Sequence, residues 1–249
     1  MPNYRSDETP TPVQSPGNCP DSTPTTSART EIDSFLDRVK ALGPGTKTGQ
    51  RGRLIFALDA TMSRQPTWDQ ACKLQAEMFR AAAAVGGLDI QLVYYRGLAE
   101  CRASSWVADS DRLGALMSSI DCRGGHTQID KVLAHARREN ESGKIAVLVF
   151  IGDAMEESLD DLCVRAGELG LRNVKAFMFQ EGYDQICEQA FREIARLTSG
   201  AFCRFAPGAA DELAELLRAA AAYAAGGLKA LADLKAQSAG IARLIEQLK

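Results

Sequence analysis

Short, fully apolar runs recur along the middle of the chain, and segments with helical periodicity separate them. Residues 54–58 read Leu-Ile-Phe-Ala-Leu, and residues 145–151 read Ile-Ala-Val-Leu-Val-Phe-Ile. Runs of this length and composition are typical of strands that are buried on both faces, as in parallel sheets. Further strands are expected at 89–95, 174–179 and 201–205. This alternation restricts the chain to an α/β fold.

The segments between these runs carry apolar residues at a spacing of three and four, which indicates amphipathic helices. Helices are expected at five positions: 67–85, 109–120, 127–140, 157–169 and 184–198. Strands that alternate with helices form a parallel sheet with right-handed crossovers. Residues 100–107 are expected to form a hairpin partner at one edge. The sequence therefore predicts an α/β, Rossmann-like, doubly wound fold, with a mostly parallel central sheet, one antiparallel edge strand and helices on both faces.

Composition divides the chain into four parts. Residues 1–30 hold six of the nine prolines among Ser and Thr, and such a segment buries too little apolar surface to offset its ordering entropy, so a disordered tail is expected. Residues 31–45 are expected to form a linker and a short amphipathic helix that docks on the main domain. Residues 51–225 form that domain. Beyond a pair of glycines, residues 228–249 are expected to form a C-terminal amphipathic helix.

Charge and cysteine usage narrow the functional classes. The formal net charge of -3 provides no overall attraction to nucleic acid or anionic lipid, so neither is expected as a partner. The seven cysteines are scattered without a C-x-x-C pair, as in reduced cytosolic proteins. The chain shows no signal-peptide pattern and no apolar stretch near the ~20 residues that a membrane helix needs. A cytoplasmic location is therefore expected.

Polar side chains follow the two most apolar runs and precede one of the helices. Asp59, Thr61 and Ser63 come directly after the first run, Asp153 comes after the second, and Thr127 lies at a helix start after two glycines. Working residues in such sheets lie at the carboxyl ends of the strands. Carboxylate and hydroxyl oxygens are the ligands that Mg²⁺ prefers. Because this set holds few carboxylates, a bound ion would stay electron-poor and attract a carboxylate from outside.

This pattern resembles the metal-ion-dependent adhesion site of von Willebrand factor A domains of the bacterial intracellular type. That family has a strand followed by D-x-[ST]-x-S, then G-x-T, then a second buried strand that ends in Asp, and the resemblance covers about residues 53–205. It implies that Thr61 and Ser63 bind Mg²⁺ or Mn²⁺ directly and that Thr127 joins them in some states. It also implies that Asp59 and Asp153 act largely through water, and that an acidic residue of a partner completes the metal sphere.

The same resemblance implies a binding module that works beside a protein partner, such as an ATPase or a stress-response complex. Two positions depart from the family's pattern, since Gly152 and Ala154 replace the usual Thr and Gly around Asp153. The departure concerns the geometry of this loop and its affinity for metal. No nucleophile with an adjacent base is visible in the sequence, so no enzymatic activity is expected.

Three alternatives stay open. A magnesium-dependent phosphatase of the haloacid dehalogenase type would use Asp59 as its nucleophile, but Thr61 stands where that family has its second acid. A scaffold protein would use the C-terminal helix as its main contact. In the third alternative, Asp59 and Thr61 only cap the helix that follows, and Thr127 caps its own helix.

Overall fold

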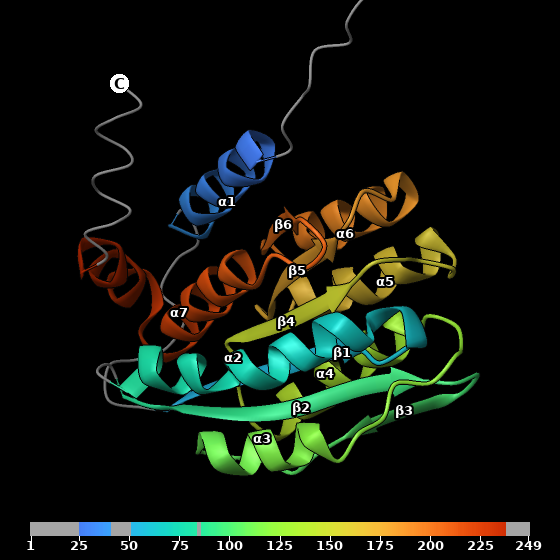
Figure 1. The fold of residues 1–249 in the computed structure, drawn as a ribbon, viewed down its shortest axis with the longest axis horizontal. Helices are drawn as coiled ribbons and strands as arrows, with labels where there is room; N and C mark the ends of the chain where they lie inside the picture. The colour runs from blue at the N-terminus through green and yellow to red at the C-terminus, as the bar shows by residue number, and fades with distance from the viewer. Residues whose placement is uncertain (1–24, 41–50, 84–85, 238–249) are drawn as a thin grey trace, which may run out of the picture.

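The computed structural model describes residues 25–40, 51–83 and 86–237. At its centre is a six-stranded sheet with strand order β3-β2-β1-β4-β5-β6 (Figure 1). Neighbouring strands are parallel except at the edge, where β3 runs antiparallel to β2. This sheet confirms the predicted doubly wound α/β architecture. The strands are β1 (Gly52–Asp59), β2 (Leu88–Arg96), β3 (Glu100–Ala103), β4 (Val147–Gly152), β5 (Lys175–Glu181) and β6 (Ala201–Phe205).

Helices cover both faces of the sheet. One face packs against α1, α2, α3 and α7, and the other packs against α4, α5 and α6. Successive side chains of β1 point to opposite faces, and both faces are buried, which explains why the sequence shows an unbroken apolar run. The helices are α1 (Thr25–Lys40), α2 (Gln65–Ala83), α3 (Ser110–Ser118), α4 (Ile129–Ser142), α5 (Leu159–Gly170), α6 (Gln185–Leu197) and α7 (Ala210–Gln237), with a 3-10 turn η1 (Met62–Arg64).

Helix α1 begins at Thr25, inside the segment predicted as a tail, and it packs on the main domain. Its buried Phe35 meets Phe177 and Phe179 of β5 edge-on, with ring centroids 5.5 Å and 5.3 Å apart. The predicted docking of this helix is therefore present. Residues 1–24 of the predicted tail and residues 41–45 of the predicted linker lie outside the described residues.

Helix α7 bends where the sequence places its second glycine. Gly227 has φ +63° and ψ −151°, a backbone conformation that L side chains rarely adopt. Helical residues continue to Gln237, and the remainder of the predicted C-terminal helix, 238–249, lies outside the described residues.

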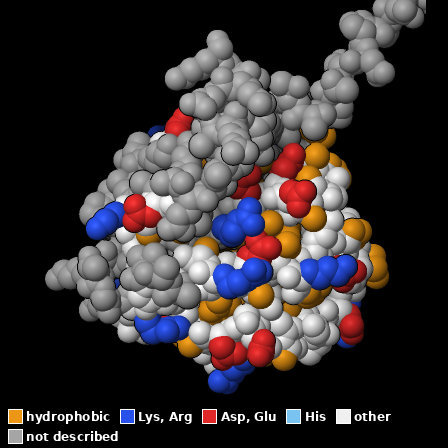
Figure 2. All heavy atoms as spheres, turned by 60° about the vertical axis from the view of Figure 1, so that its left-hand side comes forward, with side chains coloured by type: hydrophobic (Ala, Val, Ile, Leu, Met, Phe, Trp, Pro, Cys, Tyr) orange, Lys and Arg blue, Asp and Glu red, His pale blue; other side chains and the backbone are white. Residues whose placement is uncertain are grey.

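The described part has a surface of mixed charge and cysteines that are not paired with one another. On the face that Figure 2 shows, acidic and basic side chains lie interspersed around apolar ones. The six cysteines within the described ranges are free thiols, and none of the described helices is long and apolar enough to cross a membrane.

The Phe35 contacts predict how much α1 contributes to stability. Phe35→Ala removes a buried ring from between α1 and β5, so the free energy of unfolding should fall by about 3–5 kcal/mol in urea titrations followed by circular dichroism. Ser34→Ala, on the exposed side of the same helix, serves as the control. A loss below about 1 kcal/mol for Phe35→Ala would show that α1 is not docked in solution.

Candidate metal centre

The segment that follows β1 and includes η1, which we call the first loop, leaves the sheet at a buried carboxylate. Asp59 is the last residue of β1, and its carboxylate accepts a hydrogen bond of 2.7 Å from the Thr61 N–H. This bond turns the chain, so that the Thr61 hydroxyl lies 3.3 Å from the Ser63 hydroxyl. Thr61 makes no side-chain capping bond to η1, which removes the capping alternative for this hydroxyl.

The spacing of the two hydroxyls suits an octahedral ion. Ligands at about 2.1 Å from Mg²⁺ and at right angles to each other are about 3 Å apart. The Thr61 and Ser63 oxygens, 3.3 Å apart, are therefore placed as neighbouring ligands with little adjustment. Thr61 is buried and Ser63 is exposed, so the pair lies at the boundary between the sheet edge and solvent.

Parallel pairing of β1 and β4 brings the two carboxylates to the same edge. Leu58 pairs with Ile151, so the chain positions of Asp59 and Asp153 follow directly from this register. Burial raises the pKa of Asp59, the hydrogen bonds from Thr61 lower it, and the charge of Asp153 raises it again. A divalent cation would offset both the desolvation of Asp59 and its repulsion from Asp153.

The G-x-T loop is fastened to the loop of Asp153 through one glutamate. The Thr127 N–H donates to the Glu156 carboxylate, and the Thr127 hydroxyl accepts from the Glu156 N–H, both at 3.0 Å. The hydrogen bond from Thr127 lowers the pKa of Glu156, whose carboxylate also lies 3.1 Å from His126 Nδ1. Arg123, earlier in the same loop, donates its N–H to the Ala60 carbonyl at 3.0 Å. The G-x-T loop, which we call the second loop, is thus bonded both to the first loop and to the loop that carries Asp153.

Thr127 does not cap its own helix. The N-cap of α4 is Gln128, which makes no side-chain cap bond. The first N–H groups of α4, those of Ile129 and Asp130, instead donate to Glu157 at 2.6 Å and 2.9 Å. The helix predicted at 157–169 would include Glu157 in its first turn, but α5 begins two residues later, at Leu159, after the N-cap Ser158. Glu157 therefore anchors the neighbouring helix.

A buried ion pair, which the sequence did not indicate, connects the first loop to the end of β5. The Arg64 guanidinium pairs with Glu181 at the end of β5 and lies 3.8 Å from Asp153. Glu181 also accepts from the Thr67 hydroxyl and, at 3.1 Å, from the Gly208 N–H. The pair joins the β1 loop to β5 and to the start of α7.

The residues near the site offer other chemistry little support. Burial raises the pKa of Cys122 to about 11, which keeps this thiol protonated at neutral pH and therefore a poor nucleophile. Within the described ranges, no three His, Cys, Asp or Glu side chains are grouped to hold a metal. The predicted donor set differs from such a group because it combines two carboxylates with three hydroxyls.

A scan against protein-family models and a search of curated proteins find no match to this sequence. Solved structures do match. The VWA domain of SpRpn10 is 12% identical with a TM-score of 0.53, over 66% of this chain and 94% of that one. A von Willebrand factor type A protein from Catenulispora acidiphila is 17% identical with a TM-score of 0.58, over 71% and 43%. The human COPII-coat protein Sec24c is 12% identical with a TM-score of 0.51, over 72% and 32%. The matched regions are less than half of the last two chains, and identities this low establish likeness of fold alone.

The Arg64–Glu181 pair predicts a large effect of removing one charge. Arg64→Met leaves the Glu181 carboxylate buried without its cation, so the free energy of unfolding should fall by about 3–5 kcal/mol in urea titrations. Arg64→Met combined with Glu181→Gln removes both charges and should recover part of that loss. Equal losses for the single and the double variant would contradict a stabilising pairing of the two charges.

Proposed function

We propose that this chain, whose fold is that of a von Willebrand factor A domain, is a divalent-metal-dependent protein-binding module. Asp59, Thr61, Ser63, Thr127 and Asp153 would hold Mg²⁺ or Mn²⁺ at the carboxyl edge of the sheet. An acidic residue of the partner would complete the coordination sphere. The observation that carries the proposal is the convergence of the Thr61 and Ser63 hydroxyls beside the buried Asp59 carboxylate.

Each residue has a separate task in this proposal. Thr61 and Ser63 supply neutral oxygens, while Asp59 and Asp153 supply the negative charge that balances the cation. Asp59 also fixes the first loop through its bond from the Thr61 N–H. Thr127, held by Glu156, contributes a third hydroxyl from the second loop. The bound ion supplies a Lewis-acidic position that attracts a carboxylate from outside.

The phosphatase alternative lacks its proton donor. That chemistry needs an acid near the nucleophile to protonate the leaving group. Thr61 occupies the position two residues after Asp59, and its N–H is already bonded to the Asp59 carboxylate. A non-enzymatic, cytoplasmic role beside a protein partner, such as an ATPase or a stress-response complex, is therefore the form of the proposal that we favour.

Metal binding should stabilise the folded chain. At a hundredfold excess of Mg²⁺ over its Kd, stability should rise by about 2.7 kcal/mol and the Tm by about 5–10 °C relative to EDTA, measured by differential scanning fluorimetry. Ser63→Ala removes a ligand from an exposed position and should abolish most of the shift. Ser118→Ala, an exposed hydroxyl on α3, is the matched control and should keep it. A wild-type Tm that is the same in Mg²⁺ and EDTA would refute metal binding at this site.

A hydrolysis assay with a phosphate ester distinguishes the binding module from the phosphatase. Wild type incubated with p-nitrophenyl phosphate and millimolar Mg²⁺ should release no more phosphate than the Asp59→Asn variant does. Hydrolysis by wild type that Asp59→Asn removes would assign Asp59 as a nucleophile and would overturn the binding-module proposal.

A further inference from the structure

Large apolar side chains lie exposed around the candidate metal centre. Six such side chains within the described residues are more than half exposed, and four of these lie at the carboxyl edge of the sheet, either in connecting segments or, for Met62 and Ile186, at the start of η1 and α6. We refer to these four as the apolar rim: Met62 (62% exposed), Leu98 (78%), Tyr183 (54%) and Ile186 (63%). Single exposed apolar residues are ordinary, but a group of them on one face marks an interaction surface.

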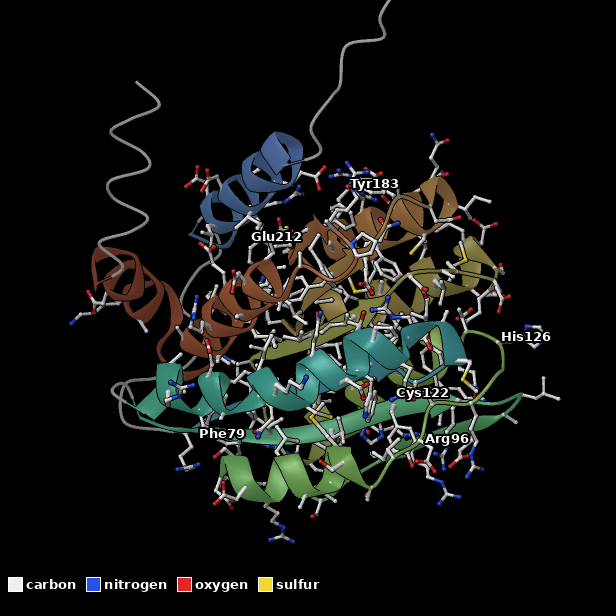
Figure 3. The ribbon with its side chains drawn as sticks, viewed as in Figure 1. Phe79, Arg96, Cys122, His126, Tyr183 and Glu212 are labelled. Atoms are coloured by element: carbon white, nitrogen blue, oxygen red, sulfur yellow. The ribbon has the colours of Figure 1, made fainter. Side chains whose placement is uncertain are left out.

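Each rim residue is tied to a loop of the candidate site. Met62 stands between Thr61 and Ser63 in the sequence. Leu98 lies in the β2–β3 turn, where the neighbouring Gly97 carbonyl accepts from the His126 N–H of the second loop at 3.2 Å. Figure 3 shows His126 at the outer end of this loop, beyond the ribbon of the sheet.

The rim continues on the other side of the site. Tyr183 and Ile186 follow Glu181, which is paired with Arg64 of the first loop. The strand order places β1 and β4, which carry the two carboxylates, between β2 and β5. Strands are about 4.8 Å apart, so β2 and β5 are separated by about 14 Å, and the rim flanks the metal centre on both sides.

Tyr183 is held in place before any partner binds. The Arg204 guanidinium lies over the Tyr183 ring at 5.0 Å from its centroid (Figure 3 shows Tyr183 beside α6). Arg204 is itself bonded to Glu31 of α1 at 2.6 Å and to Glu188 of α6 at 3.0 Å. An aromatic side chain that is already ordered loses little entropy on binding, which is why such residues often dominate interfaces.

Charge balance at this edge limits what the partner can carry. Asp59 and Asp153 would balance a divalent ion, and Glu181 already balances Arg64, while the carboxylates of Glu156 and Glu157 accept hydrogen bonds from backbone N–H groups at the same edge. With the ion bound, these two further carboxylates leave the edge negatively charged, so it disfavours additional acidic groups, and apolar contacts must supply most of the binding free energy beyond the single metal bond. A highly acidic or nucleic-acid surface does not match this arrangement.

From this geometry we infer that the apolar rim grips the partner, and that the partner is a protein segment with one acidic residue flanked by apolar side chains. The inference rests on the proposed metal-dependent function. It adds the specificity residues, with Tyr183 and Ile186 as the principal contacts and Met62 and Leu98 as the contacts on the opposite flank.

A displayed peptide library tests the inference without a known partner. A random library on phage, selected against the full chain in Mg²⁺, should yield sequences with one Asp or Glu between apolar residues. A synthetic copy of an enriched sequence is then measured by fluorescence polarisation. EDTA and Ser63→Ala should remove binding, and Tyr183→Ser with Ile186→Ser should raise the Kd at least about tenfold.

The chain offers matched controls in its other two exposed apolar residues. Val164 lies on α5, and Leu171 follows α5 at the opposite edge of the sheet. Val164→Ser and Leu171→Ser should leave the Kd within about twofold of wild type. All variants should keep the wild-type Tm without metal, because every substituted side chain is exposed.

The outcomes separate this inference from the proposed function. Peptides that bind only with Mg²⁺, yet are indifferent to every rim substitution, would overturn the rim and leave the metal site standing. Peptides that need the rim but ignore EDTA and Ser63→Ala would overturn the metal-dependent function. Failure to enrich any sequence would contradict the rim as a binding surface, whatever the Mg²⁺ shift in Tm. A dimer in light scattering that Tyr183→Ser with Ile186→Ser dissociates would reassign the rim to self-association.

Discussion

The carboxylate of Asp59 stands at the end of a strand that is buried on both faces, and the organisation of the sheet edge depends on how its charge is satisfied. Burial disfavours the charged form, and the nearby Asp153 disfavours it further. The Thr61 N–H satisfies one oxygen and, in doing so, turns the chain so that two hydroxyls lie side by side. The backbone turn and the proposed metal ligands are therefore consequences of a single buried group.

The loops around Asp59 are held by side chains of one loop that bond to a neighbouring loop, helix or strand. Glu156 secures Thr127, Glu157 secures the start of α4, and Arg64 reaches across to Glu181. A binding site needs such supporting bonds, because the side chains that bind the ion must already be in position before the ion or the partner arrives. The exposed rim residues lie in or beside the same segments, so this edge of the sheet has a polar centre with apolar side chains on both flanks.

How far the sequence predicts this structure depends on the range of each interaction. The apolar runs and helical periodicity are local, so the sheet, its antiparallel edge strand and the bend at Gly227 could be predicted. The loop positions of Asp59 and Asp153 followed from the rule that the carboxyl ends of parallel strands lie at one edge of the sheet.

Contacts between distant residues could not be predicted in this way: Arg64 and Glu181 are 117 positions apart, and nothing local marks them as partners. The contacts of Glu157 could not be predicted for the same reason, because its carboxylate accepts from N–H groups of a helix 27 and 28 positions earlier. The start of α1 at Thr25 was also missed, since a composition rich in Pro, Ser and Thr suggested a tail there.

The claim on which the other proposals depend is that a divalent cation binds to the hydroxyls of the first loop. Crystals of the wild-type chain soaked in Mn²⁺, with anomalous diffraction recorded near the manganese edge, locate the ion directly. The expected result is one strong peak at coordination distance, about 2 Å, from the hydroxyl oxygens of both Thr61 and Ser63. A map without a peak at this edge, or with its strongest peak on other side chains, would contradict the metal centre.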